Sequence, residues 1–183
     1  FTRDTRSVLA IDNAARGAAY FGCAVATDDQ GQDYLYAANF ALGQSKIEVY
    51  GADWKPRALP GKFANSEIPR DYSPWNVQAF ENRVFVAYAK QSRVKGEEEA
   101  CAGCGFIAEF DLQGRLIANW NDKGFLNAPW GFAIAPSDFG AMSGMLLVSN
   151  FGDGSIVAFD CKKKRAVDYL RGEAGAKIKI DGI

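Results

Sequence analysis

Apolar residues along the chain occur in runs of about four to seven, separated by glycine, proline, asparagine and aspartate. Within the runs apolar and polar positions often alternate, as in RVFVAYA from Arg83 and GSIVAFD from Gly154. A period of two is typical of strands with one buried face, and helical periodicity is hard to find in this chain. The pattern therefore predicts an all-β fold.

Three strings share one pattern: AYFGCAVA at 19–26, SPWNVQAF at 73–80 and APWGFAIA at 128–135. An aromatic residue comes first in each (Phe21, Trp75, Trp130) and an alternating apolar strand follows. Between them lies a small or turn-prone residue, in a column made of Gly22, Asn76, Gly131 and, in the closing DGI, Gly182. The steps along this column are 54, 55 and 51 residues, which indicates an internal repeat.

Each repeat continues in the same order. The second strands read YLYAANF, RVFVAYA and MLLVSNF, with Asn39, Tyr88 and Asn150 in register. The third strands place Ile47, Ile107 and Ile156 at equivalent positions. The fourth strands are weaker and comprise PRAL near Arg57, RLIANW from Arg115 and RAVDYL from Arg165. Every unit is thus predicted to be a four-stranded meander.

Four-stranded units that repeat at about 50 residues are typical of a β-propeller. We predict one propeller segment over residues 1–183, with three complete blades at 18–60, 72–120 and 128–171. Residues 1–12 are expected to end a preceding blade, and 178–183 to begin a following one. The start at Phe1 and the stop at Ile183 inside an apolar run indicate a processed or truncated product. The rest of the ring would come from the same chain or from another subunit.

Turn residues and connections agree with this division. Asp153-Gly154 and Gln113-Gly114 fall between predicted strands, where tight hairpins need residues that tolerate positive φ. Between the second and third strands, unit one has GQS and unit three has GDG, but unit two has KQSRVKGEEEACAGC. Insertions at one position of a repeat usually lie on one face, often the binding face.

Composition narrows the function classes. The chain has 183 residues, 48% of them hydrophobic and 13% aromatic, which is enough for a packed core. A net charge of -1 gives no field for nucleic acid, and no apolar run has the length of a membrane helix. Because the chain contains no histidine, histidine-based triads and zinc sites are excluded, and no catalytic residue stands out.

The strings NAPWGFAIAP, LLVSNFGDGSIVAFD and YLYAANF resemble a family of secreted, NHL-repeat-like proteins that are expected to form six-bladed propellers. The likeness covers nearly the whole chain. It implies a propeller fold, an extracellular location and a binding function, without an established reaction. The CAGC and KKKR strings depart from the family pattern, so any role they have would be specific to this protein.

Cys101 and Cys104 form a CxxC motif in a predicted loop. A thioredoxin-like redox site would need a βαβ context, and a c-type haem site would need histidine after Cys104, where Gly105 stands. A structural disulfide in an oxidising compartment is favoured, with free thiols or a metal or redox role as alternatives. Cys23 is expected to be a small core residue, and neither Cys23 nor Cys161 has zinc-ligand spacing.

Five residues are candidate ligand-binding groups. Trp75 and Trp130 could stack a ligand such as a sugar at the channel mouth, although packing between adjacent blades is the favoured interpretation. Asn39, Asn76 and Asn150 recur near strand ends. In lactonase-like propellers such residues help bind a divalent cation, and oxygen ligands would suit Ca²⁺, but matching carboxylates are not evident and asparagine also satisfies free backbone groups.

Charge runs at Glu97–Glu99 and Lys162–Arg165 are expected to be solvent-facing turns. We therefore predict a non-enzymatic propeller of a secreted or surface protein that presents loops to a protein or glycan partner, with no required cofactor. The alternative is a cation-dependent hydrolase or lactonase-like enzyme with its site at the central channel.

Overall fold

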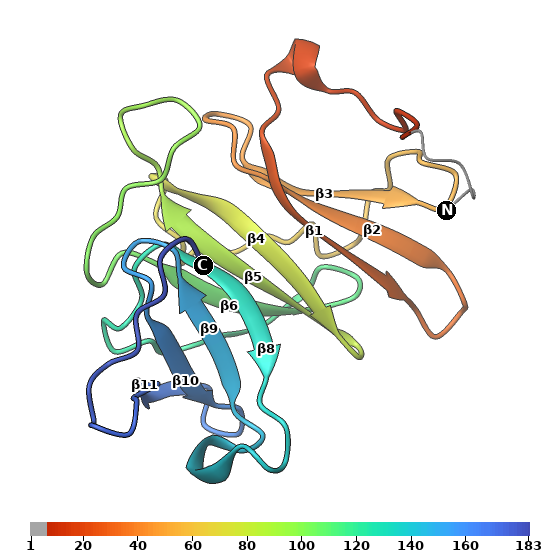
Figure 1. Ribbon diagram of the computed structural model, residues 1–183. Helices are drawn as coiled ribbons and strands as arrows, with labels where there is room; N and C mark the ends of the chain where they lie inside the picture. Colours follow the sequence, from red (N-terminus) through yellow and green to blue (C-terminus); the bar gives the residue numbers. More distant parts are fainter. Residues whose placement is uncertain (1–6) are drawn as a thin grey trace.

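A computed structural model describes residues 7–183 as eleven β-strands in three antiparallel sheets (Figure 1). The first sheet contains β1 (Tyr20–Thr27), β2 (Asp33–Asn39) and β3 (Lys46–Gly51). The second contains β4 (Tyr72–Phe80), β5 (Arg83–Lys90), β6 (Phe106–Asp111) and β7 (Leu116–Asn119). The third contains β8 (Pro129–Ile134), β9 (Leu146–Asn150), β10 (Ile156–Asp160) and β11 (Arg165–Tyr169). Strands adjacent in sequence are adjacent in each sheet, so the predicted all-β meanders are confirmed.

Helical structure in the described part of the chain is limited to two short 3₁₀ turns, η1 (Ala14–Arg16) and η2 (Gly140–Met142). Neither has the length of a segment that could span a membrane.

The strand registers match the repeat seen in the sequence. Residues Asn39, Tyr88 and Asn150 pair with Tyr20, Pro74 and Pro129, respectively. In each sheet the pairing of the first strand then becomes irregular at Phe21, Trp75 or Trp130. An extra residue on one strand makes a β-bulge, which bends the strand and redirects its side chains. The aligned aromatic residues therefore mark the same backbone irregularity in every unit.

The first sheet has three strands rather than the four expected for a complete blade. Of the described residues that follow β3, only Pro56 forms a bridge to this strand, at Tyr50, and the chain then leaves the sheet. Proline lacks the N–H group that a continuing ladder needs, and both Pro56 and Pro60 lie in this segment. Beyond Pro60, the N–H of Gly61 donates to the carbonyl of Gln113 in the β6–β7 hairpin at 2.9 Å. The connection is thus held by the second sheet.

The two ends of the described chain contain no strand. Residues 7–12 are irregular and largely exposed, and residues 1–6 of the expected preceding blade lie outside the described residues. At the other end, Lys177 and Lys179 form isolated bridges to Arg171 and Ser155. The segment predicted to begin a following blade, 178–183, runs along the third sheet, where the N–H of Ile180 donates to the carbonyl of Gly154.

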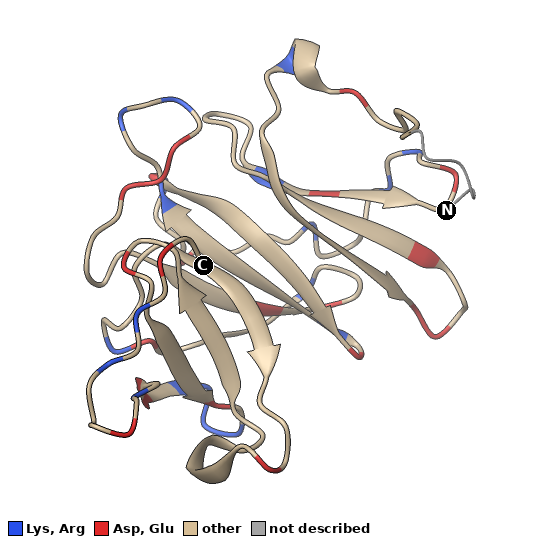
Figure 2. Cartoon of the chain, in the orientation of Figure 1, with Lys and Arg blue, Asp and Glu red and all other residues tan. Residues whose placement is uncertain are grey.

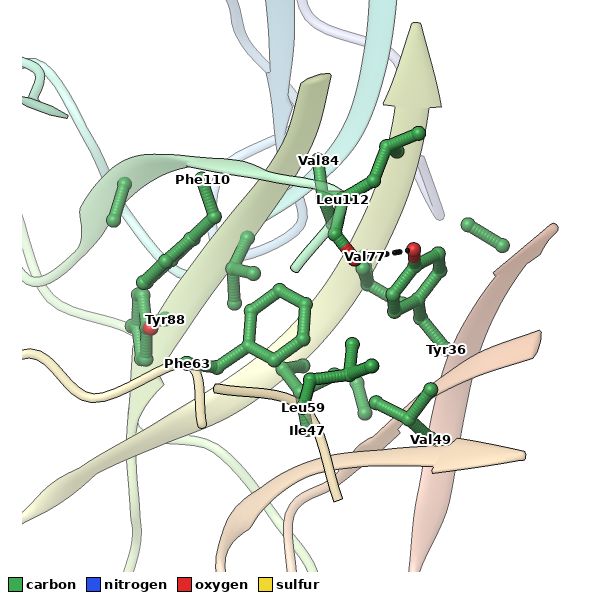
Figure 3. Close-up of a cluster of buried hydrophobic side chains, with 14 residues drawn as sticks. Tyr36, Ile47, Val49, Leu59, Phe63, Val77, Val84, Tyr88, Phe110 and Leu112 are labelled. Atoms are coloured by element: carbon green, nitrogen blue, oxygen red, sulfur yellow. Dashed lines mark hydrogen bonds between the residues drawn. The ribbon is translucent and has the colours of Figure 1, made fainter. Parts of the chain in front are cut away.

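A continuous hydrophobic core fills the space between the first two sheets (Figure 3). Tyr36 from β2 is fully buried in it, and its hydroxyl donates to the carbonyl of Leu112 at 2.9 Å. Phe63, from the connection between the sheets, packs against both Tyr36 and Phe110. Burial of large apolar side chains contributes about 1.5–3 kcal/mol each, so this interface fixes how the two sheets face each other.

A second core joins the second and third sheets and includes Phe85, Trp120 and Phe159. At its margin Glu109 of β6 is buried, and its carboxylate accepts hydrogen bonds from the Trp120 indole at 3.1 Å and from Lys164 at 2.6 Å. Lys164 belongs to the β10–β11 turn. The expectation that the whole basic run faces solvent is therefore wrong at Lys164, because a buried carboxylate on the neighbouring sheet draws it inward.

Cys23 was expected in the core, but it is exposed on β1. Its neighbour Ala24 faces the second sheet and is buried, so alternation along the strand turns Cys23 to the opposite face of the first sheet. No other sheet in residues 7–183 packs on that face, which explains the difference.

Candidate binding face

The connections β2–β3, β5–β6 and β9–β10 lie at one end of the sheets, which we call the loop end (Figure 1). Two contacts agree with this placement. The amide of Gln91 in the β5–β6 connection donates to the carbonyl of Phe40 in the β2–β3 connection at 2.7 Å. Phe151 of the β9–β10 connection packs near Trp75 at the start of β4, with ring centroids 6.2 Å apart. The prediction that the variable connections share one face is therefore confirmed for these three.

Beneath the loop end lies an aromatic cluster made of Phe21, Phe40, Trp75, Trp130 and Phe151. Trp75 is its centre, with ring centroids 4.4 Å from Phe21, 4.6 Å from Phe40 and 5.2 Å from Trp130. Because Trp75 is only 4% exposed, its ring faces are covered by neighbouring rings. Trp130 is half-buried. The packing interpretation of the two tryptophans accounts for these contacts, and each bulge turns its aromatic residue toward the adjacent sheet.

Asn39 and Asn150 play the same role in the first and third sheets. Each is fully buried at the end of a second strand. The side-chain oxygen of Asn39 accepts from the N–H of Ala19 at 3.0 Å, and that of Asn150 accepts from the N–H of Asn127 at 3.0 Å. Both side-chain nitrogens also donate within the chain. These asparagines tie the segment that leads into each first strand to the second strand.

Asn76 connects two sheets. Its side-chain nitrogen donates to the carbonyl of Trp130 at 2.7 Å, and its oxygen accepts from the N–H of Val77. On the side of the first sheet, a side chain at Gly22 would overlap the amide of Asn76. Glycine at position 22 therefore allows the first sheet to lie close to Asn76. Gly22 and Asn76, two members of the column of small or turn-prone residues, thus lie where the first and second sheets meet.

Three buried side-chain polar atoms have no hydrogen-bond partner among the described residues: Nε1 of Trp75, Oε1 of Gln91 and Oδ1 of Asn127. All three lie in the floor of the loop end. Gln91 contacts Phe40, and Asn127 precedes Ala128, which packs with Trp75. Buried polar groups are normally hydrogen-bonded, and an unpaired one costs about 1–3 kcal/mol. The three atoms therefore make the floor of the loop end the least completely hydrogen-bonded part of the described core.

The rim of the loop end is apolar and charged. Leu42 and Val94 are 72% and 56% exposed. Figure 2 shows basic residues at the tip of the β5–β6 connection and acidic residues on its return toward β6. Lys90 at the base of this loop donates to Glu99 at 2.7 Å, and this hydrogen bond raises the pKa of Lys90. The acidic run is therefore partly paired.

A disulfide joins Cys101 and Cys104 near the end of the same connection, as the sequence analysis favoured. The turn that it closes docks on the third sheet. The N–H of Gly103 donates to the carbonyl of Leu126 at 2.8 Å, and the N–H of Ala128 donates to the carbonyl of Cys104 at 2.9 Å. The disulfide thus fixes the long loop beside the floor of the loop end.

Sequence reasoning missed Phe40, Gln91 and Leu42 as members of this face. Phe40 could have been found, because it directly follows Asn39 as Phe151 follows Asn150. Gln91 has no counterpart in the other units. No group of three or more acidic or cysteine side chains with metal-binding geometry occurs in residues 7–183.

No known family model matches the chain. Three uncharacterized proteins of Acanthamoeba polyphaga mimivirus are similar to it. R648 is 37% identical over 156 residues, which cover 82% of this chain and 38% of the relative. L690 is 32% identical over 156 residues, covering 81% and 40%, and R640 is 31% identical over 183 residues, covering 97% and 33%. The chain thus spans 33–40% of the length of these relatives.

Proposed function

We propose that the chain is a segment of an NHL-repeat-like β-propeller and serves as a non-enzymatic binding module of a secreted or surface protein. Support for the propeller comes from successive meanders whose first strands are in contact, β1 with β4 and β4 with β8. Equivalent bulges at Phe21, Trp75 and Trp130 lie along this line of contact. An arc of such units would continue into a closed ring.

The observation that carries the binding proposal is the exposed apolar rim of the loop end. Leu42 and Val94 are 72% and 56% exposed and line one hollow together with Phe40 and Gln91. Apolar side chains that gather on an exposed face are typical of a protein–protein contact.

Of the two partner classes, we propose a protein rather than a glycan. A sugar ring stacks on an open aromatic face, whereas the faces of Trp75 are covered by Phe21, Phe40 and Trp130. Aliphatic rim residues such as Leu42 suit the apolar surface of a protein better than a hydroxylated sugar. The disulfide at Cys101 and Cys104 is consistent with an extracellular location.

The test compares partner capture by the wild-type protein and by the double variant Leu42→Asp, Val94→Asp. Immobilised protein is incubated with extracellular and cell-surface material, and bound proteins are identified by mass spectrometry. A matched control carries Ile117→Asp and Val167→Asp, on exposed apolar residues of the outer strands β7 and β11. A partner retained by wild type and control but lost by the rim variant supports the proposal. Equal retention by all three proteins, or specific binding to a glycan array alone, would contradict it.

A further inference from the structure

The edge of the first sheet has a vacant strand position along half of β3. In the second and third sheets β7 and β11 pair along the third strand, but in the first sheet the chain pairs only near residues 49–51 and then departs. There the N–H of Arg57 donates to the carbonyl of Val49, and the N–H of Gly51 donates to the carbonyl of Lys55. Apart from the turn bond from the N–H of Trp54 to the carbonyl of Gly51, no further backbone hydrogen bond is made on this outer edge of β3 within residues 7–183.

The free part of this edge presents the backbone of Ile47. Residues two apart in a strand direct their N–H and carbonyl groups to the same side. Because the carbonyl of Val49 faces outward, both backbone groups of Ile47 face outward as well. Unpaired edge groups of this kind are a template for an added strand.

Two cavities meet at this edge and share Lys46, Ile47, Lys62 and Phe63 in their linings. Their volumes are about 500 Å³ and about 540 Å³. The larger one reaches both faces of β3, because its lining includes Ile47 on the face toward the second sheet and Glu48 on the opposite face. A hollow that straddles an edge strand has the form of a missing strand rather than of a small-molecule pocket.

Charge around the edge favours an acidic occupant. The linings contain five cationic residues and one acidic residue, Glu48, although the whole chain carries a net charge of -1. Arg57 is paired with Asp53, and Lys46 lies 3.7 Å from Glu48. Lys62 and Arg70 form no ion pair with any residue in 7–183.

We propose that the free half of the β3 edge accepts an extended acidic segment of a partner protein as the fourth strand of the first sheet. Main-chain hydrogen bonds to Ile47 would provide affinity, as in other strand-addition complexes. Side chains of an added strand alternate between faces, so apolar residues would contact Ile47 and Leu59, and acidic residues would lie near Lys46 and Lys62. This site does not use the aromatic cluster or the rim residues Leu42 and Val94, and it does not depend on the proposed function.

The test uses a short fluorescein-labelled peptide of alternating valine and glutamate, with binding followed by fluorescence anisotropy. Binding should weaken about tenfold or more in the double variant Lys46→Glu, Lys62→Glu, because two charges that attract the peptide are reversed. Both side chains are exposed, so we expect the variant to fold. The control Lys162→Glu, Lys163→Glu reverses two exposed lysines of the β10–β11 turn and should bind like wild type. Affinity should also fall as salt rises from about 0.05 to 0.5 M.

Strand pairing is tested separately from charge. A peptide that is N-methylated at alternate residues cannot complete the ladder and should lose binding, while hydrogen exchange at the amide of Ile47 should slow when the unmodified peptide binds. Equal binding of the methylated peptide, or unchanged exchange at Ile47, would overturn the proposal. Failure of the peptide to bind, with heparin binding in its place and sensitive to the same lysines, would identify a polyanion site instead.

Discussion

Replacement of Glu109 tests how much one buried carboxylate adds to the contact between the second and third sheets. The Glu109 side chain is 8% exposed. It accepts hydrogen bonds from the Trp120 indole and from Lys164, and it forms an ion pair with Arg83 at 3.2 Å. In Glu109→Ala the buried indole N–H loses its acceptor, which costs about 1–3 kcal/mol. The bond from Lys164 is charge-assisted, but Lys164 is one-third exposed, so solvent reduces its contribution. The half-exposed Arg83 adds little.

We expect Glu109→Ala to lower the free energy of unfolding by about 2–4 kcal/mol, and Glu109→Gln by about 1–2 kcal/mol, because glutamine keeps an acceptor for Trp120. Urea unfolding followed by circular dichroism measures both values. A double-mutant cycle with Lys164→Met should give a coupling energy of about 1–2 kcal/mol. Lys163→Met, in the same turn but exposed, is the control and should leave the midpoint unchanged. A loss below about 0.5 kcal/mol in Glu109→Ala, or a coupling near zero, would refute the reasoning.

Three further predictions follow from the packing and the polar clusters. Gly61→Ala should destabilise the protein by about 1–3 kcal/mol in thermal unfolding, since its new methyl group would overlap the backbone of Gly114 and Arg115. The control Gly172→Ala has open space around the new methyl group and should leave the stability unchanged. Equal destabilisation by the two substitutions would contradict the prediction. Reduction of the Cys101–Cys104 disulfide should lower the free energy of unfolding by at most roughly 2 kcal/mol, because the loop that it closes is short. Hydrogen exchange should become faster at residues 101–105 and 126–128. Unchanged exchange there would show that the disulfide does not hold the docked turn. Burial raises the pKa of both Tyr20 and Tyr50, and a hydrogen bond from each hydroxyl to the Glu48 carboxylate raises it further. Their stabilising contribution is complete below the unfolded pKa of about 10 and is lost as pH rises through the raised folded values. The unfolding midpoint should therefore fall as the pH is raised into the alkaline range, and it should fall less steeply with pH in Glu48→Gln. The same dependence on pH in both proteins would count against the cluster of Tyr20, Glu48 and Tyr50.

The repeat could be predicted from sequence because its aligned residues occupy the same backbone geometry in each unit. Phe21, Trp75 and Trp130 fall at equivalent bulges, and Asn39 and Asn150 each bind an N–H group in the segment that leads into the first strand. Local signals of this kind, an aromatic residue before a small one and an asparagine at a strand end, depend on the unit itself and are visible in the chain.

Other features depend on contacts between units, which sequence does not display. PRAL resembles a strand, but Pro56 and the docking of Gly61 on Gln113 divert it to the second sheet. Cys23 lies in an alternating strand, yet which face is covered depends on the neighbouring sheet. Lys164 looks like one cation in a basic run until Glu109 is placed opposite it.

The contact of Asn76 with the carbonyl of Trp130 has an evolutionary consequence. The bond reaches forward, from one repeat to the next, and the acceptor is a main-chain oxygen that any residue would provide. The preceding repeat, however, must have glycine at the matching position, because a side chain at Gly22 would overlap the amide of Asn76. A tandem duplication of the second repeat would set one asparagine against another, so the gene could gain such a repeat only with a compensating change at the new junction.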